Sequence, residues 1–314
     1  MKRIFRSPQD KEQEAVYRDL MSVRSEVGAF LAAALHATRD PVEGSTWHHD
    51  LTYLKSIGRE DLIDLALRVT EHIGDALSGP AAEYSGGLAA ALSPNPAYEH
   101  PALSMSRSLM EIGMVVHSLL AADIGTESRI ARWACVELAA IQGALDVYES
   151  MAIEPASSET RTYLKLRQDE LIALGFELHF KGAPRQHEVR SVRFKAAVEP
   201  LQPKFSDLAA LGGEVSSVAY AVLSGATHSR AWFVAQSGAP AGTVRATAAG
   251  HLAWMWGGVL DEVGRYTGAD PSTVRGRLHS LYLRLWAEAG PELALLAATA
   301  QNPFRSPAPP TGGS

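Results

Sequence analysis

The sequence predicts an all-α protein, a multi-helix bundle whose helices are largely antiparallel. Three observations predict this class. Apolar residues recur at helical spacing in nearly every segment, Pro, Gly and capping residues separate the segments, and there is no convincing β-hairpin signal or repeat of fixed period. The chain has 314 residues, of which 46% are hydrophobic and 20% charged, as is typical of a globular protein with a sizeable core.

The first predicted helices lie before residue 80. Residues 9–38 carry apolar side chains at i, i+3, i+4 and i+7, and this helix must end before Pro41 because proline cannot continue it. Ser45 or Thr46 can cap a second helix. Residues 59–77 repeat the same spacing and form a third.

A helical hairpin is predicted in the middle of the chain. Residues 101–122 and 126–151 are both amphipathic, and the short link between them favours an antiparallel pair. Thr126 is a suitable N-cap for the second helix, since its hydroxyl can accept a backbone N–H bond. Residues 157–174 add a helix with a more polar face.

The segment 175–205 forms an irregular connection, with residues 176–180 extended and three prolines further on. Helices resume after it, and they are expected at residues 206–236, 243–266, 272–289 and 291–300. We expect one all-α domain over residues 1–301, with two helical halves, 1–175 and 206–301, as the alternative. The Pro, Ser and Gly content of residues 302–314 predicts a flexible tail.

The charge and cysteine content narrow the class of protein, its partners and its compartment. The 29 basic and 35 acidic residues give a net charge of -6, so nucleic acid is an unlikely partner. No apolar stretch approaches the roughly 20 residues of a spanning helix, and the polar start does not look like a signal peptide. The single cysteine, Cys135, fits a reducing compartment. We therefore expect a cytoplasmic protein without a membrane partner, and a homo-oligomer stays open.

Two motifs resemble those of an uncharacterised group of all-helical actinobacterial proteins. One is Arg-x-x-x-Glu at Arg107 and Glu111, followed by Arg129 and Arg132; the other is Tyr-x-x-x-Ser-Gly-x-x-His over residues 220–228, with Trp nearby. At a greater distance the chain is similar to HEPN-type helical proteins. That resemblance implies an interaction or defence protein, without nuclease activity of its own because the Arg–His spacing of HEPN nucleases is not clearly present.

The second motif is the catalytic candidate. Tyr220, Ser224 and His228 recur every four residues, so a helix would place them in one stripe, where His228 could act as a general base. The alternative is that the three side chains satisfy one another inside the bundle.

The first motif is a candidate for substrate binding. Arg107 and Glu111 can pair on one helix face, and Arg129 and Arg132 can converge on Glu111 across the turn. Such arginines could clamp a phosphate, or they could form a structural ion-pair network that makes Glu111 inaccessible.

A third candidate is a magnesium site. Glu60, Asp61 and Asp64 offer hard oxygen ligands on the first turns of a helix, where the helix dipole alone also favours acidic residues. Their arrangement is similar to the Asp-rich motif of class I terpene cyclases, which implies Mg²⁺ and an isoprenoid diphosphate. The corresponding second motif has Ala210 in place of the central ligand.

These residues lead to two hypotheses. In the first, the protein is an enzyme or binder of a small hydrophobic molecule, and an enzyme would be a lyase or cyclase, or a hydrolase. Its apolar pocket would lie between helices, with Trp232, Trp254 and Trp256 added to the stripe. In the second, it is the HEPN-like interaction or defence protein.

Overall fold

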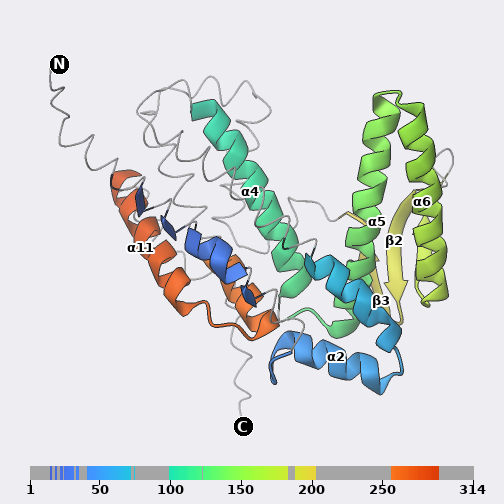
Figure 1. Cartoon of the computed structure of the whole chain (residues 1–314), viewed down its shortest axis with the longest axis horizontal. Coiled ribbons are helices and arrows are strands. Elements are labelled where there is room, and N and C mark those ends of the chain that lie inside the picture. The colour runs from blue at the N-terminus through green and yellow to red at the C-terminus, as the bar shows by residue number, and fades with distance from the viewer. Residues whose placement is uncertain are drawn as a thin grey trace, which may run out of the picture.

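The computed structural model describes most of the N-terminal two thirds of the chain and one C-terminal stretch (Figure 1). The described residues are scattered positions between 15 and 34, then 41–71, 74, 99–121, 123–182, 188–202 and 256–289. They are mostly helical, as the apolar periodicity predicts. The labelled helices are α2 (Thr46–Ser56), the 3₁₀ turn η1 (Glu60–Leu62), α4 (Glu99–Leu120), α5 (Thr126–Ser150), α6 (Glu154–Ala173) and α11 (Ser272–Ala289). Residues 63–71 and 256–267 are helical as well.

Capping explains where two of these helices begin. The Ser45 hydroxyl accepts a hydrogen bond from the backbone N–H of His48 at 3.1 Å, which confirms the predicted cap of α2. The cap predicted for α5 is wrong, because Gly125 is the N-cap residue and makes no side-chain cap. The Thr126 hydroxyl instead donates to the Asp50 carboxylate at 2.9 Å.

The all-α prediction is wrong between residues 177 and 200, where three strands form an antiparallel sheet in the order β1-β2-β3. The strands are β1 (Glu177–Phe180), β2 (Val189–Phe194) and β3 (Ala197–Pro200). The extended conformation expected at residues 176–180 is confirmed by β1. The other two strands were not predicted because the turn between them lacks its usual sequence signal. Lys195 has a φ of 53° in this turn, at a position where Gly or Asn is usual.

The sheet lies against α5 on one face, and α6 runs beside α5 (Figure 1). α5 makes its most extensive helix contacts with α6, and α4 crosses obliquely to it in Figure 1, so the close helical pair is α5–α6 rather than the predicted α4–α5. The inward sheet residues Val192 and Phe194 are buried, while Arg193 on the same strand is exposed.

The apolar core joins the helices of both ends of the chain. Trp47 of α2 meets Trp133 of α5 edge-on, with ring centroids 6.0 Å apart, and Tyr266 packs on Trp47 at 5.9 Å. All three side chains are nearly inaccessible. In the part of the chain that the structure describes, no helix is both long enough and apolar enough to cross a membrane.

Candidate functional site

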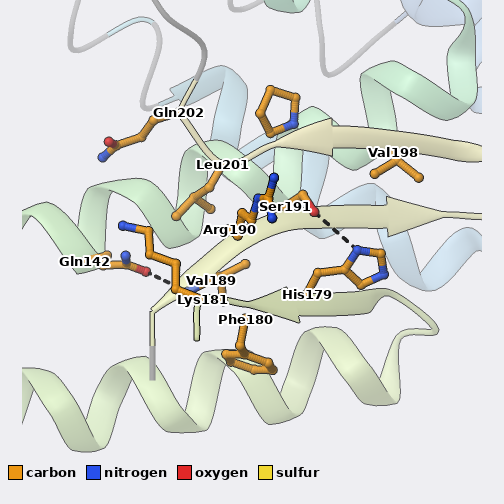
Figure 2. A pocket seen from close by; sticks show the side chains of 11 residues that line it. Gln142, His179, Phe180, Lys181, Val189, Arg190, Ser191, Val198, Leu201 and Gln202 are labelled. Atoms are coloured by element: carbon orange, nitrogen blue, oxygen red, sulfur yellow. Dashed lines mark hydrogen bonds between the residues drawn. The ribbon is translucent and has the colours of Figure 1, made fainter. Parts of the chain in front are cut away.

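A pocket of about 710 Å³ opens at one end of the sheet (Figure 2). The end of β1, the start of β2 and the end of β3 supply most of its wall, and α5 contributes one side chain. Its lining residues are Gln142, His179, Phe180, Lys181, Val189, Arg190, Ser191, Val198, Pro200, Leu201 and Gln202.

An irregularity in the sheet shapes this pocket. The β1–β2 register pairs His179 with Ser191 but Phe180 with Val189, so Arg190 has no opposite residue on β1. Such a bulge re-aims side chains, because strict alternation would send neighbouring residues to opposite faces. Arg190 and Ser191 are consecutive, and both line the pocket.

The floor of the pocket is tied to α5 by Gln142, which is 4% exposed. Its side-chain oxygen accepts a hydrogen bond from the backbone N–H of Val189 at 3.3 Å (Figure 2). A side-chain amide carries one acceptor and two N–H donors, so the donors of Gln142 are not used by this bond.

The pocket has a positive character. Lys181 and Arg190 line it, and no Asp or Glu is among the eleven lining residues. The Lys181 ammonium pairs with the Glu188 carboxylate beside the pocket. Arg190 is exposed, and its guanidinium has no charged partner in the described ranges of the chain.

The pocket also holds a hydroxyl–imidazole pair on neighbouring strands. The Ser191 Oγ lies 3.3 Å from the His179 Nδ1 (Figure 2). On the other side of the ring, the His179 Nε2 lies 3.8 Å from a carboxylate oxygen of Glu177, and this oxygen also lies 3.4 Å from the Arg193 guanidinium.

The structure divides the predicted arginine cluster into separate pairs. Arg107 pairs with Glu111 at 2.7 Å, as predicted, but the Glu111 side chain is 23% exposed and therefore not inaccessible. Arg129 and Arg132 do not converge on Glu111. Arg132 binds the Glu199 carboxylate of β3 at 2.8 Å instead.

Arg129 belongs to a buried network that holds α2, α4 and α5 together. Its Nε donates to the Asp50 carboxylate at 2.7 Å, and its terminal nitrogens donate to the backbone oxygens of Ala121 and Ile124. Asp50 is 0% and Arg129 is 2% exposed. Burial raises the pKa of Asp50, although the Arg129 guanidinium and the Thr126 hydroxyl act in the opposite direction. This network is structural, because it is closed to solvent.

The predicted magnesium ligands are not gathered into a site. Asp61 is bound by the Arg59 guanidinium at 2.9 Å, a contact that lowers the pKa of its carboxyl. Among the residues that the structure describes, which include Glu60, Asp61 and Asp64, no group of three or more acidic, His or Cys side chains could hold a metal ion.

The predicted catalytic stripe lies outside the described residues. The stripe consists of Tyr220, Ser224 and His228, and Trp232 and Trp254 lie outside the described residues as well. Trp256 is described, and its side chain is 7% exposed within the hydrophobic core.

Two buried groups lie near the ends of α4 and β3, and the first of them was not predicted from the sequence. Glu262 is 2% exposed, bound by Arg265 at 2.9 Å, and 3.9 Å from His117. Burial raises the pKa of Glu262 and lowers that of His117 to about 4. Cys135 is buried beneath the sheet, which raises the pKa of its thiol to about 12, so it is no nucleophile at neutral pH.

Comparison with protein-family models, with curated proteins and with solved structures finds no match to this chain. The resemblances to the actinobacterial group, to HEPN proteins and to terpene cyclases stay predictions.

Proposed function

We propose that the protein binds a small molecule that carries an anionic group next to an apolar portion. The pocket beside Arg190 supports this proposal. Its volume of about 710 Å³ falls within the range of about 300–1,000 Å³ typical of small-molecule sites.

The residues of the wall select the charge of the ligand. A cationic ligand would meet the Arg190 guanidinium without any lining carboxylate to balance it, since the Glu188 carboxylate beside the pocket already pairs with Lys181. An anion would meet a guanidinium that offers the planar fork suited to carboxylate and phosphate, together with the N–H donors of Gln142. The apolar portion of the ligand can pack against Phe180 and Val198, because each of these side chains is more than two fifths exposed and offers apolar surface.

This proposal keeps the small-molecule hypothesis from the sequence and moves the pocket from between helices to the sheet. An isoprenoid diphosphate belongs to the same chemical class, since it joins an anionic head to an apolar chain. The metal-dependent cyclase chemistry is not part of the proposal, because Arg59 engages the Asp61 carboxylate.

Four ligands that share one apolar chain test the proposal: octyl phosphate, octanoate, octanol and octylamine. We expect calorimetric binding of the two anions and none of octylamine. Arg190→Gln should weaken octyl phosphate binding by about 10- to 100-fold, the effect of losing a charged hydrogen bond of about 1.5–3 kcal/mol.

The control is Arg193→Gln, which removes an exposed arginine from the same strand outside the pocket lining. It should retain the affinity of the wild-type protein. Equal affinity for all four ligands, or undiminished binding to Arg190→Gln, would contradict the proposal.

The interaction-protein hypothesis stays a second candidate because of the α5–α6 turn. Val147, Met151 and Ile153 are exposed by 53%, 63% and 38% at this end of the hairpin, which Figure 1 shows at an extremity of the described structure. Exposed apolar clusters often mark contacts with other proteins.

A photocrosslinker at Ser150, compared with one at the exposed Lys165 on α6, tests this second candidate in cells that produce the protein. A discrete adduct that forms only from position 150 and disappears in Met151→Ser supports it. Equal adducts from both positions argue against it.

A further inference from the structure

The pocket contains the parts of an acyl-transfer site. Ser191 on β2 and His179 on β1 are cross-strand partners, and the Ser191 Oγ is 3.3 Å from the imidazole Nδ1. This distance is within the reach expected of a nucleophile and its base, which is often looser before the substrate binds.

The Glu177 carboxylate lies on the Nε2 side of the His179 imidazole, opposite Ser191. Glu177 precedes His179 by two residues on β1, so both side chains lie on the same face of the strand. Its oxygen is 3.8 Å from Nε2, and Arg193 lies 3.4 Å from the same oxygen. A carboxylate there favours the tautomer with the proton on Nε2, which leaves Nδ1 free to accept a proton.

The pair faces the pocket rather than a packed core. Ser191 and His179 both line it, and the His179 side chain is 41% exposed. A serine and histidine that only satisfied each other would need no cavity and no cation beside them. Here the bulge brings Arg190 into the same wall.

We propose that Ser191 and His179 are the catalytic residues of an esterase site whose substrates are esters with an anionic group on the acyl side. Glu177 is a positioning residue. The substrate class rests on the proposed function, since Arg190 would bind the anionic group.

The reaction needs only water besides the ester. The Ser191 Oγ attacks the carbonyl carbon while its proton passes to the His179 Nδ1. The bond to the leaving alcohol then breaks, and His179 returns the proton to the alcohol oxygen. Water attacks the acyl group on Ser191 and gives a proton to His179, the acid leaves, and the proton returns to the Ser191 Oγ.

A fluorophosphonate probe tests the nucleophile directly, because it phosphonylates activated serines and leaves ordinary serines unmodified. We expect one label per chain, mapped to Ser191 by mass spectrometry. The label should be absent from Ser191→Ala and slowed at least about 100-fold in His179→Gln, since a general base contributes about 10²–10⁴-fold. The absence of a label, or a label at another residue, would overturn the proposal.

Hydrolysis of the mono-4-nitrophenyl ester of adipic acid tests the substrate class against neutral 4-nitrophenyl butyrate. We expect a higher kcat/KM for the anionic ester, with this preference lost in Arg190→Gln. Glu177→Gln should lower kcat with little change in KM, whereas a merely structural role would move the melting temperature instead. Ser150→Ala and His279→Gln remove an exposed serine and an exposed histidine elsewhere and should leave the rate unchanged.

The two proposals fail separately. If octyl phosphate binds through Arg190 but Ser191 is not labelled, the catalytic inference is wrong and ligand binding stands. If Ser191 is labelled but anions neither bind nor are preferred as substrates, the dyad stands and the anionic ligand class is wrong.

Discussion

The buried pair between Asp50 and Arg129 should be among the most sensitive positions of the fold. Asp50→Ala would leave the Arg129 guanidinium buried without its counter-ion, since the two groups are 2.7 Å apart and their side chains are 0% and 2% exposed. Breaking such a pair costs about 3–5 kcal/mol, a large fraction of the roughly 5–15 kcal/mol that stabilises a typical protein.

Urea unfolding followed by far-ultraviolet circular dichroism measures this loss. Asp50→Asn keeps the side-chain shape and one acceptor oxygen, and it should fall between the wild type and Asp50→Ala. The matched control is Arg161→Ala, which breaks an ion pair with Glu149 in which the side chains are 53% and 38% exposed. That change should cost less than about 1 kcal/mol. If Asp50→Ala costs no more than Arg161→Ala, the network does not hold the helices together.

Three further predictions follow from the described contacts. Burial lowers the pKa of His117 from 6.5 to about 4, so on acidification this histidine takes up a proton in the unfolded chain before it does so in the folded protein. The contribution of the neutral His117 to the free energy of unfolding is therefore complete above about pH 6.5 and is lost as the pH falls toward 4. The free energy of unfolding should fall by about 2 kcal/mol more between pH 7 and pH 5 in the wild type than in His117→Asn; parallel pH profiles of the two proteins would refute this. Glu111→Ala should cost less than about 1 kcal/mol in the urea assay, since its pair with Arg107 is partly exposed, and a loss of 3 kcal/mol would show that it is a buried pair after all. Cys135 should react with a thiol reagent at pH 8 only in urea, because burial raises its pKa to about 12, and rapid reaction of the native protein would contradict its position under the sheet.

The helices could be predicted from the sequence because their apolar spacing is local. Residues 272–289 were expected to be helical, and α11 spans Ser272–Ala289. Residues 176–180 were expected to be extended, as they are in β1, but β3 has only four residues, too few to establish a period. The bulge at Arg190 also breaks the alternation of β2, although its Val and Phe content was a signal for a strand.

The candidate site was harder to predict because its residues meet only through the fold. Arg129 binds the Asp50 carboxylate, 79 residues away in the sequence, and Arg132 binds the Glu199 carboxylate, 67 residues away. Local spacing instead suggested Glu111, only one helical turn from Arg107. The pocket likewise combines α5 with the ends of three strands, and no motif in the sequence predicts this arrangement.

Amide chemical-shift mapping with octyl phosphate tests the central claim, that the sheet pocket is a binding site for an anionic, partly apolar molecule. We predict saturable shifts at Val189, Arg190, Ser191 and Val198, and none along α11. In Arg190→Gln the same shifts should need at least a tenfold higher ligand concentration. Shifts that are centred elsewhere in the protein, or that do not depend on Arg190, would contradict the claim.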